Sequence, residues 1–317
     1  MEGFWNIFQA FSVVLVIGGT PLLFATLGEL LTEKAGHLNL GVEGMMLIGA
    51  VAGFAAGHFT GSPLLAMGGA FLAGGLGAMI YGFLTVTLRA NQVVSGLALT
   101  MFGTGISSYL GVNFIGQKMS AEISAFFSPV AIPLLSSIPY VGRVFFRQDP
   151  MVYLGYVTVA LLGTYLYRTR IGLNLRAVGE NPGAADASGI NVDLYKYVHI
   201  FLGGALCGLG GAYLSVVAVP QWQDGITAGR GWIAIALVIF AGWNPFKAIL
   251  GAYLFGGLSI IGFYFGNYFS AWNISQNLID MLPYAVTILV LTASSVRKSK
   301  EKGAPKALGV AYYREER

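Results

Sequence analysis

The sequence predicts an all-α protein, a polytopic bundle of membrane-spanning helices. Of its 317 residues, 56% are hydrophobic and only 10% are charged, whereas soluble domains carry about 25% charged residues. The chain also has 45 glycines, and glycine is more frequent in membrane helices than in soluble ones. The net charge of +4 comes without a cluster of aromatic and basic residues, so nothing indicates nucleic acid as a partner.

Apolar stretches predict about nine spans, because a helix needs about 20 mostly apolar residues to cross a bilayer. The seventh stretch is short for a full crossing, which is typical of one half of a broken helix. The predicted spans are 8–31, 38–60, 63–88, 92–113, 150–168, 198–219, 231–243, 246–269 and 277–295.

The basic residues predict the orientation of these spans. With the N-terminus outside, the loops and the tail place fourteen basic residues on the cytoplasmic side and four on the outside. Cytoplasmic loops of membrane proteins carry an excess of Lys and Arg, so we expect the N-terminus outside and the C-terminus inside. The cytoplasmic set includes Lys34, Arg89, Arg176, Lys196 and Lys247.

This orientation divides the chain into a transmembrane domain, residues 1–296, and a basic cytoplasmic tail, residues 297–317. The loop 169–197 is then cytoplasmic and the loop 114–149 is external. The external loop is apolar but broken by three prolines within FFSPVAIPLLSSIPY. It is either an interfacial segment lying on the bilayer or a docking surface for an external partner.

Regularly spaced glycines predict close helix packing. Gly49, Gly53, Gly57 and Gly61 recur every four residues along the second span, and GGALCGLGGAY at 203–213 is similarly rich in glycine. Small residues at this spacing let two helix backbones approach closely. Both stretches are expected to face neighbouring helices.

The sequence shows no constellation of catalytic or metal-binding residues. The three histidines, His37, His58 and His199, are far apart, and Cys207 is the only cysteine. The sequence has no G-x-x-x-x-G-K-[ST] stretch to cradle ATP phosphates, and no HExxH or GxSxG motif. We therefore expect no catalytic residue, no metal ligand and no cofactor in this chain.

Polar residues inside spans are costly and usually face the bundle interior or a cavity. Asn39 and Glu43 are four residues apart, a spacing that predicts one shared helical face, and Gly36, Gly41 and Gly44 interrupt the same stretch. A polar helix start broken by glycines is typical of a substrate path, because unwound backbone can line water. The alternative is that Glu43 pairs with a neighbouring helix and fixes the packing.

A second polar passage, QWQDGITAGRGW at 221–232, precedes the seventh span. Arg230 lies there between two glycines and close to Trp232, where a loop can line a cavity or its external mouth. Trp222 and Trp232 either stack on a flat ring or anchor the chain at the membrane interface. Asn91 and Gln92 open the fourth span, where they either line the path or cap the helix.

The cytoplasmic loop contains a short helix with a cap at each end. Asn181 is a favoured N-cap residue, Pro182 suits the first helical position, and Asp186 lies near the positive end of the helix dipole. Gly189 supplies the stop. A helix of about two turns is marginal alone in water. It must therefore be held by the bilayer surface or by another protein.

Three segments, taken in order, carry a resemblance to a known family: AGHLNLGVEGMMLIGA, AVGENPGAADASGINV and GRGWIAIALVIFAGWNP. They resemble the membrane permease subunits of bacterial ATP-binding-cassette importers, in the branch for ribose-type sugars, branched-chain amino acids and nucleosides. Within that branch the chain most resembles the shorter of the two permeases of nucleoside importers, which are also described as simple-sugar importers. The resemblance covers about residues 10–295.

The resemblance implies roles for two sets of residues. The short helix would be the coupling helix that seats in a cleft of the ATPase. Its residues are Gly179, Glu180, Asn181, Pro182, Ala184, Ala185, Asp186, Gly189 and Ile190. The resemblance also places the segment around Asn39 and Glu43 on the translocation path. With the other polar passages, the candidate path residues are Asn39, Glu43, Asn91, Gln92, Arg230 and Trp232.

The resemblance further implies a set of partners in a bacterial cytoplasmic membrane. They are a second homologous permease forming a heterodimer, a cytoplasmic ATPase that binds ATP and Mg, an external substrate-binding lipoprotein, and the lipid bilayer. The cargo would be a nucleoside or a simple sugar.

Two other functions compete with this one. An ion-coupled secondary transporter needs ionisable groups at mid-span, whereas Glu29, Glu43 and Asp280 lie near predicted span ends. A membrane-embedded enzyme needs a nucleophile with a base beside it, and the sequence offers no such pair; a non-transport subunit of a larger complex is the related alternative.

Overall fold

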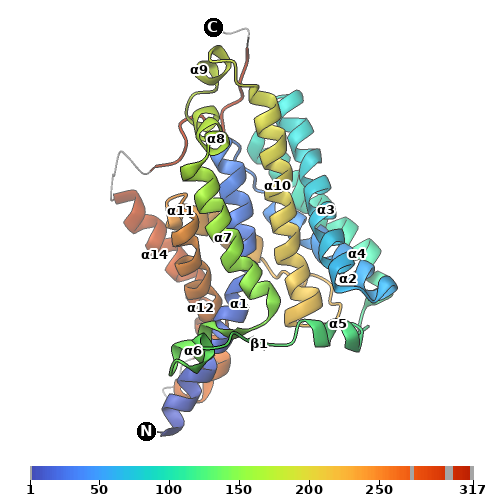
Figure 1. Cartoon of the computed structure of the whole chain (residues 1–317), viewed down its shortest axis with the longest axis vertical. Helices are drawn as coiled ribbons and strands as arrows, with labels where there is room; N and C mark the ends of the chain where they lie inside the picture. Colours follow the sequence, from blue (N-terminus) through green and yellow to red (C-terminus); the bar gives the residue numbers. More distant parts are fainter. Residues whose placement is uncertain (1, 272–274, 297–302, 315–317) are drawn as a thin grey trace.

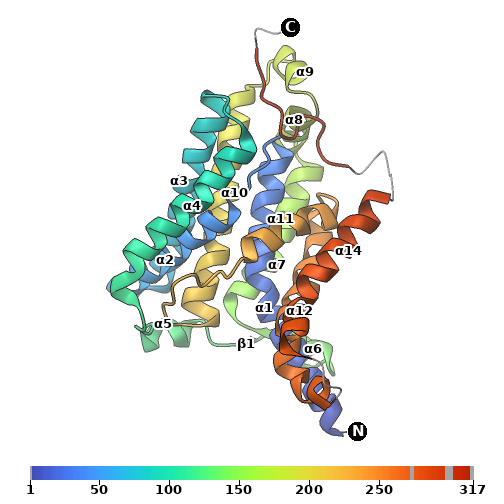
Figure 2. The ribbon, with the colours of Figure 1, turned by 180° about the vertical axis from the view of Figure 1, so that it is seen from behind.

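Long helices make up most of the computed structural model, which describes residues 2–271, 275–296 and 303–314 (Figures 1 and 2). The all-α prediction is confirmed. The helices are α1 (Glu2–Lys34), α2 (Val42–Thr60), α3 (Pro63–Gly82), α4 (Gln92–Gly111), α5 (Ala121–Phe126), α6 (Val141–Phe145), α7 (Pro150–Arg168), α8 (Arg170–Glu180), α9 (Pro182–Ala187), α10 (Val192–Ala212), α11 (Arg230–Ala241), α12 (Pro245–Ala271), α13 (Gln276–Asp280) and α14 (Leu282–Val296).

Shorter elements extend or connect these helices. Two π-helical turns, η1 (Phe83–Thr87) and η4 (Tyr213–Ala218), continue α3 and α10, and two 3₁₀ turns are η2 (Val112–Phe114) and η3 (Leu135–Ser137). The strands of the described residues, β1 (Val130–Ala131) and β2 (Arg147–Gln148), pair antiparallel.

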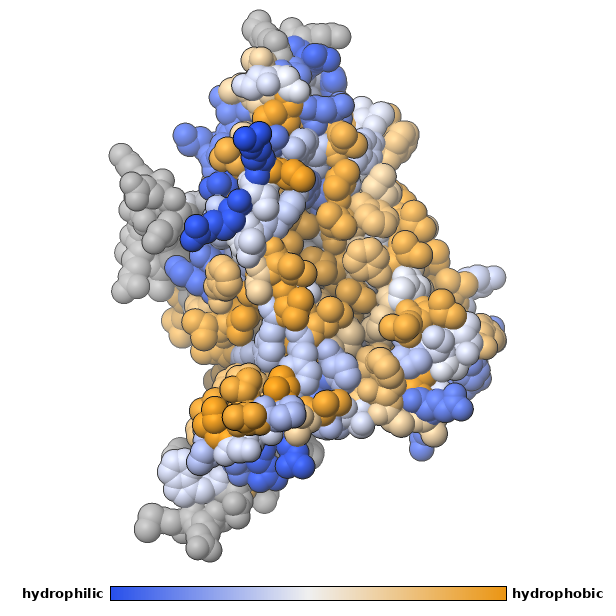
Figure 3. Space-filling view, in the orientation of Figure 1, coloured by the Kyte–Doolittle hydropathy of each residue, from blue (hydrophilic) through white to orange (hydrophobic). Residues whose placement is uncertain are grey.

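Six helices of the described chain are long and apolar enough to cross a membrane. They coincide with the first six predicted spans. The last three predicted spans fall on α11, α12 and α14, where the apolar segments Arg230–Ala241 and Pro245–Ile261 are shorter, so these three crossings stay predictions. In Figure 3 apolar residues cover the middle of the face on which α7 and α10 lie, and hydrophilic residues gather around α8 and α9.

Helix α10 packs against α1, α2 and α3, and its glycines make this possible. A Cβ atom at Gly211 would lie 1.8 Å from the carbonyl oxygen of Met46 in α2, and one at Gly208 would lie 2.4 Å from that of Ala70 in α3. Gly203 approaches the backbone of α1 in the same way. The predicted packing role of residues 203–213 is therefore confirmed, because side chains here would push the backbones apart.

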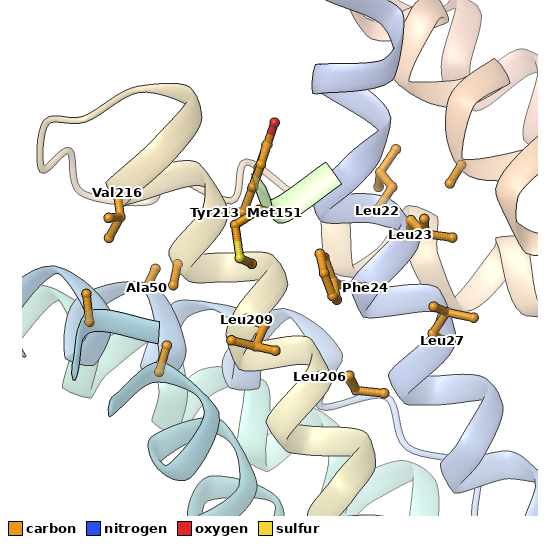
Figure 4. Close-up of a cluster of buried hydrophobic side chains, with 14 of the residues drawn as sticks. Leu22, Leu23, Phe24, Leu27, Ala50, Met151, Leu206, Leu209, Tyr213 and Val216 are labelled. Atoms are coloured by element: carbon orange, nitrogen blue, oxygen red, sulfur yellow. The ribbon is translucent and has the colours of Figure 1, made fainter. Parts of the chain in front are cut away.

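The main hydrophobic core fills the space between these helices (Figure 4). Phe24 of α1 lies against Leu206 and Leu209 of α10, and η4 adds Tyr213. The Tyr213 hydroxyl donates a hydrogen bond of 2.8 Å to Asp149, the N-cap residue of α7. The one polar end of this aromatic core residue thus ties α7 to the centre of the bundle.

The glycine series of α2 is a packing surface at three of its four positions. A Cβ at Gly49 would lie 2.2 Å from the Cα of Gly208, and Gly53 and Gly57 also face neighbouring helices closely. The expectation is wrong for Gly61, where a Cβ would meet only the side chain of Glu122, at 3.7 Å, and which ends α2 as its C-cap with φ 66°. The spacing of four simply continues past the end of the helix, into a turn that favours glycine.

The segment 114–149 folds across the end of the bundle opposite to α9 (Figure 1). Ile123 and Phe127 are buried in the main core, and Val144 packs against Val16 of α1. Leu134, in contrast, is 87% exposed. The segment is thus anchored to the bundle by a few side chains, while other apolar side chains face outward.

The glycine contacts predict that replacing glycine by alanine destabilises the protein at Gly49 but not at Gly68. Gly49→Ala places a methyl group against the backbone of Gly208 and should lower stability by about 1–3 kcal/mol. Gly68→Ala is the matched control, because Gly68 lies in α3 with nothing within 4 Å of its Cβ position; alanine there is neutral or stabilising, since it forms helices better than glycine. The measurement is the thermal unfolding midpoint of the purified chain in detergent, and equal midpoints for both variants would contradict the packing account.

Candidate functional site

Residues 35–41, which we call the α1–α2 break, are mostly buried backbone without helical structure. Buried backbone groups need hydrogen-bond partners within the protein, because leaving them unpaired costs free energy. Glu29 of α1 accepts the N–H of Asn39 at 2.9 Å, and the side chain of Gln92 in α4 accepts the N–H of Leu38 at 2.8 Å. Two donors of the break are thus satisfied from two different helices.

The carbonyl groups of the break also have partners. The Tyr81 hydroxyl of α3 donates to the carbonyl of Leu38 at 2.8 Å, and the Thr100 hydroxyl of α4 donates to the carbonyl of Leu40 at 2.9 Å. The α1–α2 break is therefore held in one conformation by side chains from α1, α3 and α4.

Asn39 lies inside this break and not on α2, which begins at Val42. Its Oδ1 accepts the N–H of Gly41 at 2.8 Å, a turn typical of asparagine. The expectation that Asn39 and Glu43 share a helical face is therefore wrong. The reason lies in the glycines: Gly36 adopts φ 86°, which no helix continues, and α1 ends just before it.

Glu43, in the first turn of α2, holds a distant segment through its carboxylate. Its Oε1 accepts the hydroxyl of Thr227 at 2.6 Å and the N–H of Gly229 at 2.8 Å, and its Oε2 accepts the N–H of Gly231 at 2.6 Å. Hydrogen bonds to a charged acceptor are about twice as strong as neutral ones. Glu43 thus fastens the start of α11 to the start of α2.

The start of α11 is built to receive this carboxylate. Its N-cap, Gly229, is left-handed with φ 80° and offers no capping side chain, so the free N–H groups of the first turn are available to an outside acceptor. A Cβ at Gly231 would lie 2.4 Å from the nitrogen of Glu43, so only glycine permits this approach. A negative charge at a helix N-terminus is favourable, which fits the interpretation that Glu43 fixes packing.

Arg230 and Trp232 flank the same helix start. The Arg230 guanidinium donates to the carbonyl of Thr227 at 3.1 Å, and Trp232 is 40% exposed. Both interpretations of Trp222 are wrong: its side chain is buried in the core beside Phe54. Gly111 leaves the room for it, because a Cβ there would lie 2.5 Å from the indole ring.

The two residues that open α4 differ in their surroundings. Asn91 is the exposed N-cap, and its side chain accepts the N–H of Val94 at 3.1 Å. Gln92 is buried and bonds the α1–α2 break. Of the six candidate path residues, Asn39 and Gln92 therefore meet at the break and Glu43 and Arg230 at the start of α11. Asn91 and Trp232 sit at exposed positions.

The candidate coupling segment is formed by α8 and α9. Asn181 separates the two helices, and its side chain accepts the N–H of Ala184 at 3.0 Å as the N-cap of α9. Pro182 occupies the first position of α9, and Gly189 follows the helix with φ 83°. A Cβ at Gly179 would lie 2.3 Å from the carbonyl oxygen of Lys34, so glycine lets α8 rest directly on the last residue of α1.

Ala185 faces inward from α9. It is 3% exposed and packs with Val178 and Val192, and Ile190 covers the same cluster. Ala184 and Ala187, together with Glu180, are exposed. A partner that docks on α9 therefore meets this exposed face, and Ala185 holds α9 on its own chain.

Sequence reasoning missed several residues that hold these sites, namely Glu29, Glu33, Tyr81, Thr100 and Thr227. Glu29 and Glu33 stand four apart in an apolar span, which is a signal for a shared polar function. Glu33 accepts the indole N–H of Trp243. Tyr81 and Thr100 carry no comparable signal, because single hydroxyl residues are common in membrane helices, and Thr227 is one polar residue among several in the turn before α11.

The contacts of Glu43 predict a local loss of structure on substitution. Glu43→Ala leaves the half-buried N–H of Gly229 and the buried N–H of Gly231 without an acceptor and should lower stability by about 2 kcal/mol or more, with faster hydrogen exchange at both glycines. The stability of Glu43→Gln, which keeps one side-chain oxygen as an acceptor, should lie between that of the unchanged protein and that of Glu43→Ala. Glu122→Gln, at an exposed first-turn acid of α5, is the control. Unchanged exchange at both glycines in Glu43→Ala would refute the capping role.

Comparison with known proteins relates this geometry to a family. Residues 11–291 match the family described as "Branched-chain amino acid transport system / permease component". No solved structure matches the chain.

Several curated relatives cover nearly the whole chain. It is 38% identical to the putative glucose ABC transporter permease protein TsgC13 of Haloferax volcanii, over 95% of this chain and 96% of the relative. It is 36% identical to the nucleoside ABC transporter permease protein NupC of Lactococcus lactis, over 97% and 98%. It is 33% identical to the guanosine ABC transporter permease protein NupQ of Bacillus subtilis, over 98% and 100%. A second guanosine permease of Bacillus subtilis, NupP, is 25% identical over 90% of this chain.

The family match covers most of the chain, and the relatives above 30% identity extend over almost all of it. The apolar helices, the buried α1–α2 break and the capped helix α9 thus occur in a protein that belongs to the permease family of branched-chain amino acid transport systems.

Proposed function

We propose that this chain is a permease subunit of an ATP-binding-cassette importer and forms half of its translocation path. The observation that carries the proposal is the near full-length similarity to three permeases of such transporters, at 33–38% identity. Membership in a permease family supports a transport role and not catalysis.

The distribution of charge supports assigning the α9 end of the bundle to the cytoplasm. Lys34, Arg176 and Lys247 line one cavity there, and Arg89 and Lys196 lie over aromatic rings of the C-terminal tail at the same end. Cytoplasmic ends of membrane helices carry most of the Lys and Arg. The N-terminus, at the opposite end in Figure 1, is then outside, and the protein is a multi-pass component of the cell membrane.

In this arrangement α9 is the coupling helix and docks on a cytoplasmic ATPase. Its exposed residues Ala184 and Ala187 are small, which lets a cleft close tightly around the helix. ATP and Mg are bound by that ATPase, and this chain carries no cofactor. We assign the region around the α1–α2 break and the start of α11 to the border of the translocation path, with Arg230 and Trp232 nearest to solvent among its residues.

Two further partners complete the importer. Bacillus subtilis has two guanosine permeases related to this chain, NupQ and NupP, which supports a second, homologous permease as the other half of a heterodimer. An external substrate-binding lipoprotein would deliver the cargo on the side of the segment 114–149.

For the cargo we propose a nucleoside. Two of the three relatives at 33–38% identity are named for nucleosides, and the third is named for glucose, so glucose is the second candidate. Both cargoes use the same fold, and the choice depends on the site and not on the architecture.

The coupling role predicts that a charge on the exposed face of α9 stops transport. Ala184→Arg should lower ATP-dependent uptake by at least about tenfold, because a charge buried in an interface without a partner costs more than about 1.4 kcal/mol, while membrane insertion is retained. Thr60→Arg, at the exposed last residue of α2 and outside the segment 114–149, is the control. Normal uptake by Ala184→Arg would exclude α9 as the docking element. Ala185→Arg is less informative, because Ala185 is buried within the chain.

The cargo is tested by uptake in cells that express the complete importer and lack their own nucleoside and glucose uptake. Labelled guanosine or uridine should accumulate, excess unlabelled nucleoside should compete, and glucose should not. Accumulation of glucose that nucleosides leave unaffected would reverse the assignment. Uptake that survives ATP depletion but stops with an ionophore would instead indicate an ion-coupled transporter.

A further inference from the structure

The described part of the C-terminal tail, residues 303–314, lies along α8 and α9 (Figures 1 and 2). The N–H of Ala307 donates to the carbonyl of Gly179 at 3.0 Å. Leu308 packs against the cluster that includes Leu30 of α1 and Leu175 of α8. The tail thus follows the segment that leads into α9.

The end of the tail is fastened to α9 itself. The Tyr312 hydroxyl donates to Asp186 of α9 at 2.9 Å, and the guanidinium of Arg314 lies 3.1 Å from the same carboxylate. The Tyr312 ring packs on the buried cluster of Ala185 and Val178. Because Arg314 is exposed, its ion pair contributes little, and the half-buried ring of Tyr312 and its hydrogen bond are the main anchor.

Tyr312 and the next residue, Tyr313, connect the tail to other helices at this end. The Nζ of Lys196 in α10 lies 5.7 Å from the centre of the Tyr312 ring, and the guanidinium of Arg89, after α3, lies 4.7 Å from that of Tyr313. Both distances fit cation–π contacts. The tail is therefore a packed element of this surface.

A groove runs between α9 and the tail. Its walls are Glu180, Asn181, Pro182 and Gly183 on one side and Lys306, Ala307, Val310, Ala311, Tyr312 and Tyr313 on the other. Val310 is 59% exposed. The groove is thus lined mainly by apolar, aromatic and small residues, and the core of a protein interface is rich in aromatic residues and poor in charge.

The length of α9 indicates that it cannot form a docking surface alone. Six residues span only about 9 Å, whereas a stable interface buries about 800 Å² on each partner. Neighbouring surface must contribute the rest. The tail covers the side of α9 that carries Asp186, so a protein that encloses α9 must either contact the tail or displace it.

We propose that the tail and α9 form one composite docking surface, and that the ATPase contacts both, with an apolar side chain of the ATPase in the groove between Pro182 and Val310. This proposal rests on the proposed role of α9 as the coupling helix. Displacing the tail would uncover Leu308 and the ring of Tyr312 and leave Asp186 without these partners, so contact is favoured over displacement.

The test is photo-crosslinking from single cysteines in the assembled importer. The only native cysteine, Cys207, is buried, so benzophenone maleimide labels the introduced thiols. Val310→Cys reports on the tail, Gly183→Cys on α9, and Ala121→Cys on the opposite end of the bundle. We expect crosslinks to the ATPase from positions 310 and 183 at comparable yield, and none from position 121.

The outcomes separate this proposal from the function on which it rests. A crosslink from Gly183→Cys without one from Val310→Cys would overturn the composite surface and leave the coupling role of α9 intact. No crosslink from either position would overturn both. Adding Tyr312→Ala to Val310→Cys should lower the yield from position 310 roughly fivefold or more and leave that from Gly183→Cys unchanged, with Tyr312→Phe intermediate. An unchanged yield from position 310 with Tyr312→Ala would also count against the proposal.

Discussion

Buried backbone that leaves the helix must find its hydrogen bonds within the protein, and in this chain that constraint acts at residues 35–41. Four backbone groups of the break are bonded by the side chains of Glu29, Tyr81, Gln92 and Thr100, which come from α1, α3 and α4. These helices cannot shift independently without leaving buried polar groups unpaired, which costs about 1–3 kcal/mol for each group. The positions of α1, α3 and α4 are therefore fixed relative to the break, and α2 starts from it.

The candidate coupling segment, α8 and α9, lies directly against this break. The backbone of Gly179 in α8 rests on the carbonyl of Lys34, the last residue of α1, and the tail contacts Gly179 through Ala307. No side chain intervenes between α8 and α1 at this contact. A displacement of α8 and α9 therefore acts on the last turn of α1, and through it on the α1–α2 break. This is the shortest physical connection between the proposed ATPase contact and the proposed path.

The sequence predicted what depends on local chemistry and missed what depends on contacts across the bundle. The caps of α9 at Asn181 and Pro182 and the close packing at Gly49 and Gly208 follow from residue type and spacing, and the structure has them. The partner of Glu43 could not be predicted, because Thr227 and Gly231 are almost two hundred residues away. The contact between the tail and Asp186 also joins residues far apart in the sequence, 126 positions from each other.

The two predictions that fail near glycines, those for Asn39 and Gly61, fail because they depend on contacts that a local pattern does not contain. The spacing between Asn39 and Glu43 predicts a helix at Asn39, and the spacing of four that continues to Gly61 predicts a packing surface there. Glycine permits a helix interior, a close approach and a left-handed turn alike, and only the surrounding contacts decide among them. The break at Gly36 is decided by side chains of three helices, which a single local pattern does not contain.

The strongest contacts of the chain also limit how it can move. Where glycines of α10 touch the backbones of α1, α2 and α3, no flexible side chain can absorb a displacement, and tightly packed interiors do not deform continuously. Glu43 adds three hydrogen bonds between α2 and the start of α11. These five helices are therefore expected to move as one body. We expect access to the proposed path along α11 to change by rotation of these five helices as a group. In an importer with two permeases, they would rotate against the other permease.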